Sequence, residues 1–274
     1  MENMNELQFE SPSFYKRLKG MLGVDFYRLF HTPLFYIFIA IAAIIPAMIL
    51  GMTSIETAEG MKPLYDNTWH VIAAKTPLYV VNDIADYANM NMVFIFGGIM
   101  VSIFIGHDYK SGYVKQLFTT HAKKQDYMLS KSIIGAFSMV CMCITYLIGT
   151  VVAGLFVQAS FEVNAGSLII AIISKMIMSL GWASLYTFLN VIFRRFFGVS
   201  IASSFFFGTG ILIIAFGALT SNSSILNIFL YGSSVFACLS SNLLTLLICS
   251  LVSVSWALIY NELGTVLLSK CDVY

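Results

Sequence analysis

The sequence predicts an all-α integral membrane protein with six transmembrane helices, and two observations lead to this fold class. Of the 274 residues, 58% are hydrophobic and only 11% are charged, and the mean hydropathy is +0.83. An average soluble chain is about 25% charged, so this much apolar surface requires lipid as its solvent. The apolar runs are also long and unbroken, without the alternation of a membrane barrel, so the spans are expected to be helices.

Six apolar runs of 16–26 residues are interpreted as spans, since a bilayer requires roughly 20. Span one contains Pro46, which is expected to kink it. The long polar segment 53–89 is expected to be an external loop, and 220–241 a re-entrant segment, because the apolar runs of the latter are too short to span. The whole chain, 1–274, is expected to form a single transmembrane domain, with spans at 33–52, 90–105, 132–157, 168–193, 198–219 and 243–268.

Residues 1–31 are expected to form a cytoplasmic tail followed by an amphipathic helix that begins near Ser13. Apolar residues recur there at helical spacing, and cations occupy much of the remaining circumference. Such a helix lies in the membrane interface with its cations near anionic headgroups. The alternative is a solvated helix that packs on protein. The apolar positions are Phe14, Leu18, Met21, Leu22, Phe26, Leu29 and Phe30, and the interfacial cations are Lys16, Arg17, Lys19 and Arg28.

The distribution of basic residues predicts the orientation of the chain, because short loops rich in Lys and Arg stay in the cytoplasm. Twelve of the 15 fall on one predicted side: four before span one, five in the stretch 106–131, two between spans four and five, and one in the tail. Both termini are therefore expected in the cytoplasm of a cell with the protein in its plasma membrane. The net charge of +1 gives no indication of a nucleic-acid partner.

Neither catalytic nor metal-binding motifs are recognisable. The chain has no Gly-x-x-x-x-Gly-Lys-Ser/Thr loop to cradle a nucleotide, and its four histidines are far apart. The five cysteines include no Cys-x-x-Cys pair and are interpreted as small apolar fillers. We therefore expect no catalytic residue, no bound metal and no cofactor in this chain.

Two stripes of small residues mark helix faces that another helix can approach closely. One lies in span two and the other in span five, beside three consecutive phenylalanines. These positions are also expected to border the path of a transported substrate. They are Gly98, Ser102 and Gly106 in span two, and Ser200, Ser204, Phe205 and Gly208 in span five.

Two ionisable residues lie within predicted spans. Lys175 is expected to reach the outer interface and extend its ammonium into water. Glu262 lies about 12 Å from the inner end of span six by helical rise, at a different depth from Lys175. An intramembrane Glu is a functional candidate by default, and the alternative is a carboxyl group that is hydrogen-bonded to neighbouring helices.

The basic stretch 106–131 is predicted to be a helix-turn-helix against the inner membrane face, with a turn at Gly112. Val114, Leu117 and Phe118 would provide a small apolar face. A helix this short is not stable alone, so it is expected to dock on something. The alternative is a solvated basic loop that only determines topology.

The order of these parts resembles the membrane subunit of type-2 ABC transporters, and within that family the small permeases of the bacitracin and lantibiotic export or immunity group. The resemblance depends on Asp108-Tyr-Lys-Ser-Gly-Tyr-Val-Lys115 and on Lys123-Lys-Gln-Asp-Tyr-Met-Leu-Ser-Lys131. Tyr113 stands where the family usually has Thr, and Asp108 where Glu is common. The six-span layout covers nearly the whole chain, whereas the motif is only moderately specific.

The resemblance implies a homodimeric permease that binds a separate ABC ATPase subunit, which would hold the ATP and Mg²⁺. A coupling helix at 112–118 would receive the motion of the ATPase, and the substrate would be an amphipathic peptide, such as an antimicrobial peptide or toxin, exported from a bacterium. The residues that the resemblance assigns to coupling are Asp108, Lys110, Gly112, Tyr113, Lys115, Leu117 and Phe118.

Two other functions remain open at this point. The first is ABC export of a lipid or a polysaccharide. The second is a stand-alone secondary transporter or channel, in which Glu262 would be essential. The absence of an internal inverted repeat argues against the second.

Overall fold

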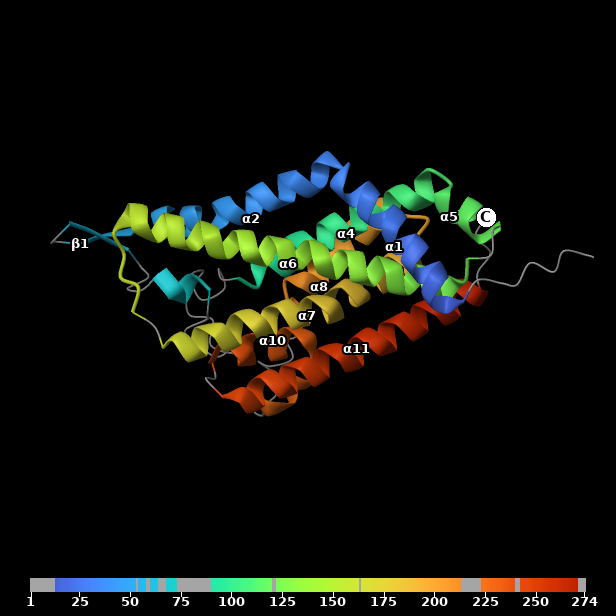
Figure 1. The fold of residues 1–274 in the computed structure, drawn as a ribbon. Helices are drawn as coiled ribbons and strands as arrows, with labels where there is room; N and C mark the ends of the chain where they lie inside the picture. Colours follow the sequence, from blue (N-terminus) through green and yellow to red (C-terminus); the bar gives the residue numbers. More distant parts are fainter. Residues whose placement is uncertain are drawn as a thin grey trace, which may run out of the picture.

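The computed structural model is a bundle of long helices that run roughly along one axis (Figure 1). It describes residues 13–52, 54–57, 60–63, 68–72, 90–119, 122–162, 164–212, 223–239 and 242–270. Residues 1–12 of the predicted tail, most of the predicted outer loop and the last part of predicted span five, 213–219, therefore lie outside the described residues.

The helical elements follow the predicted apolar runs closely at most boundaries. They are α1 (Phe14–Phe30), α2 (Pro33–Met52), α4 (Met92–Lys110), α5 (Tyr113–Thr119), α6 (Lys124–Val157), α7 (Ala165–Ile192), α8 (Phe197–Gly208), α10 (Leu230–Leu239) and α11 (Leu243–Lys270), with short 3-10 helices η1 (Thr68–Val71) and η2 (Ser223–Ile228). A two-stranded antiparallel hairpin, β1 (Ser54–Thr57) and β2 (Gly60–Pro63), follows α2.

The bundle has two distinct ends (Figure 1). The hairpin β1–β2, the end of α6 and the start of α7 lie at one end, which we call the hairpin end. α1, α5, the start of α6 and the end of α11 lie at the other, which we call the α5 end. Both ends of the described chain, at residues 13 and 270, are thus on the same side of the bundle.

Among the described residues, five helices are long and apolar enough to cross a membrane: α2, α4, α6, α7 and α11. The protein is therefore a helical membrane protein. The remaining predicted span, 198–219, is represented by α8, an apolar helix of only 12 residues, and 213–222 lie outside the described part of the chain. α2 coincides with predicted span one and continues through Pro46 without interruption.

A large boundary difference is at the start of α6, which begins at Lys124 rather than at residue 132. Its 34 residues are about 50 Å long, well beyond the ~30 Å hydrocarbon core. The first turns of α6 therefore extend past the core at the α5 end. The charged residues at 124, 126 and 131, which suggested a loop, lie on this extension.

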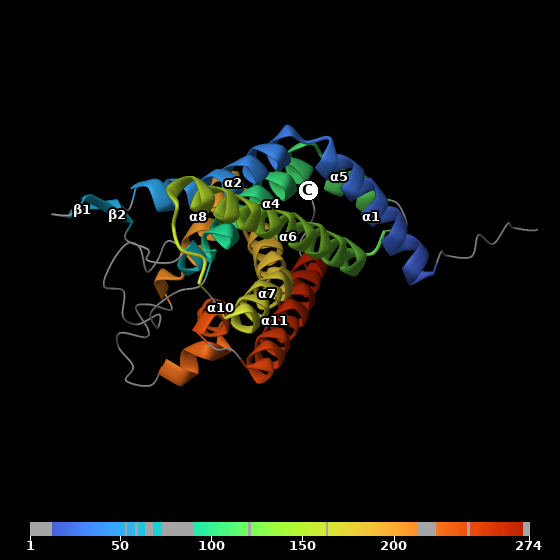
Figure 2. The same cartoon turned by 60° about the vertical axis from the view of Figure 1, so that its left-hand side comes forward.

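Helices pack closely where glycines, which have no side chain, lie at the contact. A Cβ added at Gly149 of α6 would lie 2.2 Å from the carbonyl oxygen of Ala43 in α2, so these two backbones are in direct contact. Gly181 of α7 faces Ser253 of α11, and the Gly181 N–H donates to the Ser253 hydroxyl at 3.2 Å. Figure 2 shows α7 and α11 side by side, with α10 against them.

The predicted re-entrant segment contains η2 and α10, which are two short helices in succession. α10 packs on α7 and α11. The Trp182 indole N–H donates to the buried Ser234 hydroxyl at 3.4 Å. This segment is therefore folded against the bundle as two short helices, in keeping with apolar runs too short to span.

Candidate functional site at the α5 end

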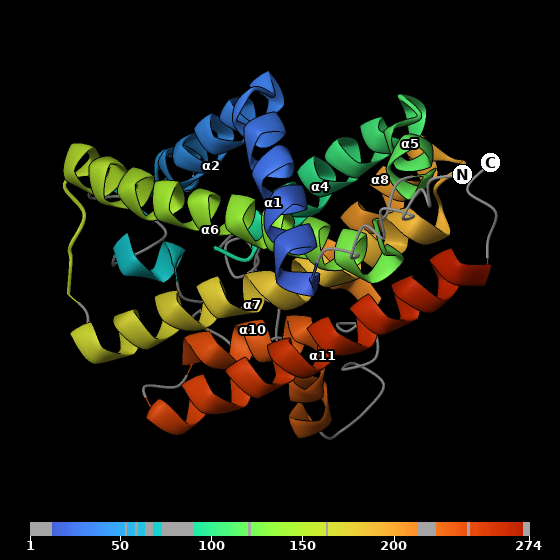
Figure 3. The same cartoon turned by 45° about the vertical axis from the view of Figure 1, so that its right-hand side comes forward.

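Figure 3 shows α1 crossing α6. Four charged side chains from α1, α4 and α6 meet near this crossing. Asp25 and Arg28 come from α1, Asp108 from α4 and Lys131 from α6. The Lys131 ammonium lies 2.6 Å from Asp25 Oδ1 and 2.7 Å from Asp108 Oδ2. Arg28 donates to Asp108 Oδ1, and its Nη1 is 3.6 Å from Asp25. We call these four residues the ion cluster.

The ion cluster is buried and its charges balance. Asp25, Asp108 and Lys131 are at most 1% exposed, and the Arg28 side chain is 24% exposed. Two carboxylates face two cations, and Ser130 Oγ donates a further hydrogen bond of 2.7 Å to Asp25. A buried ion pair is tolerated only when the partners are this well matched, because each charge has lost its hydration. The cluster therefore determines how α1 sits on α4 and α6.

Two further contacts join helices at the same end. Arg17 Nε of α1 donates to Asp126 of α6 at 2.7 Å. The Lys124 ammonium donates to the carbonyl oxygen of Leu268 in α11 at 2.7 Å. The start of α6 is thus bound on one side to α1 and on the other side to the end of α11.

The short helix α5 is connected directly to the ion cluster. Gly112, whose φ is +72°, provides the left-handed turn between α4 and α5 that other residues rarely adopt. The next residue, Tyr113, places its ring 4.5 Å from the Arg28 guanidinium carbon, a cation–π distance. Burial, reinforced by the charge of Asp25, raises the pKa of Tyr113 above its ordinary value. For Arg28, burial lowers the pKa, but the hydrogen bond and charge of Asp108, together with Asp25 and Tyr113, outweigh burial, so the net shift of the pKa is upward.

The apolar face of α5 packs on the chain itself. Val114 is 1% exposed and belongs to a small core with Met21, Tyr127 and Leu268. Leu117 and Phe118 are partly buried against this core, and the Phe118 and Tyr127 rings meet edge-on at 5.6 Å. This satisfies the requirement that so short a helix must dock on something.

The outward face of α5 is consequently polar. Lys115, Gln116 and Thr119 are exposed, whereas Leu117 and Phe118 are partly buried. Of the residues assigned to coupling, Lys110 is also exposed and Asp108 is fully buried in the ion cluster. The assigned residues thus fall into an exposed polar group and an internal group that supports it.

α1 packs part of its apolar surface on the protein and leaves part of it exposed. Met21 and Leu29 are buried, and Phe26 packs on the Phe137 ring of α6 at 5.0 Å. Among the predicted interfacial cations, Arg17 and Arg28 are the ones that pair with internal carboxylates. The cations Lys16 and Lys19 are exposed, together with the apolar side chains of Phe14, Tyr15, Val24, Tyr27 and Phe30.

The small-residue stripes lie at helix contacts in the middle of the bundle. Ser102 of α4 and Ser204 of α8 share a buried hydrogen bond of 2.7 Å. Asn190 of α7 donates to Ser102 at 3.0 Å and accepts a hydrogen bond from Ser200. These residues join α4, α7 and α8 through buried polar groups.

The glycines of these stripes face an aromatic side chain. A Cβ at Gly98 would lie 2.7 Å from the ring of Tyr186, and one at Gly208 would lie 2.8 Å from its hydroxyl. Phe205 points away from this contact and is 50% exposed. The stripe positions are therefore packed against other helices, and Phe205 lies on the outer surface.

No family model and no curated protein matches the chain.

Metal-binding potential can be assessed only for the part of the chain that the structure describes. There, no group of three or more His, Cys, Asp or Glu side chains could hold a metal ion. The carboxylates of the ion cluster already face Arg28 and Lys131.

The interpretation of Lys175 was wrong. Its side chain is fully buried and donates to Asn91 Oδ1 at the start of α4, so it does not extend to the outer interface. Glu262 is exposed on α11, and Gln125 Nε2 of the first turn of α6 is 3.4 Å from its carboxylate. Glu262 is thus near the α5 end of the bundle and not surrounded by helices.

Several site residues were missed from the sequence, and one of them could have been found. Asp25 lies on the same helical face as Met21 and Leu29, at spacings of four residues. A single carboxylate within an apolar stripe indicates a buried cationic partner, because an unpaired charge would be strongly disfavoured there. Nothing local identifies that partner as Lys131, which is 106 residues away. Asn190 and Asn91 carry no comparable signal.

Proposed function

We propose that this protein is the membrane-spanning permease subunit of an ATP-driven ABC exporter in a bacterial cell membrane, and that both termini face the cytoplasm. One observation carries the proposal: α5 holds a polar face, with Lys115 and Gln116 exposed, at the end of the bundle where the basic residues gather. The positive charge of that end favours the cytoplasmic side. A separate ATPase subunit would bind this face and supply ATP and Mg²⁺.

α5 packs on several helices, and this packing makes α5 suitable for transmitting force. Its apolar side packs against Met21 of α1, Tyr127 of α6 and Leu268 of α11. Its first residue, Tyr113, stacks on Arg28 of the ion cluster. A displacement of α5 by a partner would therefore act on α1, α4, α6 and α11 together rather than on one flexible loop.

The proposal also includes a substrate class and an assembly. Two copies would pair in the membrane and move an amphipathic peptide outward, in export or in immunity to an antimicrobial peptide. The surfaces of α8 and α11 available for pairing are apolar, with Phe205 and Leu251 at 50% and 68% exposed. This step depends on the family resemblance and not on a site in the structure.

We expect the double substitution Lys115→Glu and Gln116→Glu to abolish coupling without unfolding the protein. Both side chains are exposed, and two added carboxylates reverse the charge that a partner would meet. The measurement is substrate-stimulated ATP hydrolysis by the co-purified complex in nanodiscs, which should fall at least about tenfold. Photo-crosslinking from position 116 in native membranes should yield a polypeptide with a P-loop.

Lys19→Glu is the matched control, since it reverses an exposed charge on α1 at the same end. Charged substitutions at Leu117 or Phe118 are unsuitable, because these side chains support α5 from below. Full coupling in the Lys115/Gln116 variant would refute the assignment of α5. Transport by the purified chain alone, driven by an ion gradient, would favour a stand-alone transporter.

A further inference from the structure

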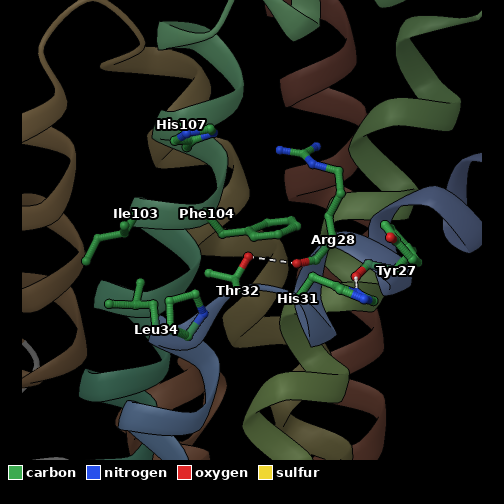
Figure 4. Close-up of a pocket in the computed structure, with 9 residues that line it drawn as sticks. Tyr27, Arg28, His31, Thr32, Leu34, Ile103, Phe104 and His107 are labelled. Atoms are coloured by element: carbon green, nitrogen blue, oxygen red, sulfur yellow. Dashed lines mark hydrogen bonds between the residues drawn. The ribbon is translucent and has the colours of Figure 1, made fainter.

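A pocket of about 470 Å³ opens where α1 turns into α2, against the end of α4 (Figure 4). One part of its wall is polar and comes from Arg28, His31, Thr32 and His107. The other part is apolar and includes Ile103 and Phe104 of α4. Figure 4 shows Arg28 and His107 on the same side of the Phe104 ring, with His31 and Tyr27 together at the α1 side.

The polar wall has groups that are free to meet a ligand. His31 Nδ1 donates to the carbonyl oxygen of Tyr27 at 2.7 Å, and the two rings stack at 4.0 Å. This hydrogen bond assigns the Nδ1 proton and makes Nε2 the ring nitrogen that remains for a ligand. His107 is exposed one turn from the end of α4. An imidazole that carries a proton on both ring nitrogens is a cation and a hydrogen-bond donor at each of them.

Arg28 separates the pocket from the acidic residues of the ion cluster. It lines the pocket and at the same time binds Asp108 and faces Asp25. Both of these carboxylates are 0% exposed. An anion in the pocket would therefore meet the guanidinium and the two histidines, with the carboxylates behind the Arg28 side chain.

The pocket lies at the start of α2, a helix that is long and apolar enough to cross a membrane. α2 begins at its floor with Pro33 and Leu34 and enters the membrane, while the preceding α1 exposes Lys16 and Lys19 at the same end. Below the pocket, the α2 side chains Tyr36 and Ile37 are 53% and 52% exposed. A pocket with a polar, cationic wall next to an exposed apolar helix surface is complementary to a molecule with an anionic headgroup and acyl chains.

We propose that this pocket binds the phosphate headgroup of an anionic membrane phospholipid, with its acyl chains lying along the outer surface of α2 and α4. Arg28, His31 and His107 contact the phosphate, and Thr32 lies at its edge. Ile103 and Phe104 contact the glycerol and the first methylenes. A bound lipid there fills the corner between α1 and α2 and stabilises the position of α1 on the bundle.

The test measures lipid binding to the delipidated full-length chain in detergent by native mass spectrometry, without any ATPase. The probes are phosphatidylglycerol and phosphatidylcholine with identical acyl chains. The wild-type chain should bind phosphatidylglycerol roughly tenfold more tightly, because phosphatidylcholine adds to the same phosphate a quaternary ammonium that the cationic wall of the pocket repels. The double variant His31→Ala and His107→Ala should lose this preference, and both sites are exposed, so folding should be unaffected.

Three controls distinguish a lipid site from a general effect of surface charge and from a site for free phosphate. Ile103→Trp should weaken the binding of both lipids, because the larger side chain fills the pocket. Lys19→Ala removes an exposed charge of α1 outside the pocket, and this variant should bind both lipids like the wild-type chain. Equal affinity for the two lipids, or an unchanged preference in the histidine variant, would overturn the proposal. Displacement of phosphatidylglycerol by low-millimolar inorganic phosphate would also overturn it, by identifying a site for free phosphate. The result is independent of whether the chain is a permease.

Discussion

Replacing Lys131 by methionine should lower the free energy of unfolding by about 3–5 kcal/mol, the usual effect of removing one partner from a buried ion pair. The substitution leaves Asp25 and Asp108, both fully buried, with Arg28 as the remaining cation of the cluster. The hydrogen bond from Ser130 to Asp25 cannot compensate for a missing charge. The measurement is SDS-induced unfolding in mixed micelles, followed by far-UV circular dichroism.

A double variant tests whether charge balance is the cause. Lys131→Met combined with Asp108→Asn retains one carboxylate and one cation, Asp25 and Arg28, which are 3.6 Å apart. The double variant should therefore be more stable than Lys131→Met alone, a coupling that a mutant cycle measures directly. If the two effects simply add, the ion cluster does not act as a unit.

Gly149→Ala should destabilise the protein by about 1–3 kcal/mol or more, as overpacking does in tight cores. The new methyl group would lie 2.2 Å from the carbonyl oxygen of Ala43 and 3.1 Å from its Cα. These are backbone atoms within a helix and cannot rotate aside, so α2 and α6 would have to separate. Thermal unfolding of the two proteins in detergent measures this loss of stability.

Gly20→Ala should have the opposite sign. Gly20 is exposed on α1, and a Cβ there would meet no heavy atom within 4 Å. Alanine stabilises a helix interior by up to about 1 kcal/mol relative to glycine. A similar loss of stability in both variants would show that a general effect of the substitution, and not the contact between α2 and α6, explains the Gly149 result.

Helix positions were largely predictable, because apolar length is a local property. α2 and the start of α11 agree with the predicted bounds, and α6 ends at the predicted residue 157. The start of α6 was misplaced because Asp126 and Lys131 were counted as loop residues. Their partners, Arg17 and Asp25, are 109 and 106 residues away, and no pattern within the stretch 106–131 indicates them.

The direction in which side chains point was predicted less well than the helices themselves. The amphipathic character of α1 was correct, but a helix with one apolar face fits either lipid or protein, and here Met21 and Leu29 face protein. The position of the Lys175 side chain was also not predictable from the sequence alone. Its depth in α7 suggested the outer interface, whereas Asn91 of α4 offers a buried acceptor that only the fold brings near.

The long sequence separation within the ion cluster has a consequence for biogenesis. Lys131 is added 106 residues after Asp25, an interval of about 5–20 s at roughly 5–20 residues per second. Until then the nascent α1 has only Arg28, at i+3, to offset its carboxylate, so it stays at the water-facing surface of the bilayer. α1 can settle onto its neighbours only after the third long apolar helix starts to emerge from the ribosome, and a chain truncated before that helix would leave its N-terminal segment undocked.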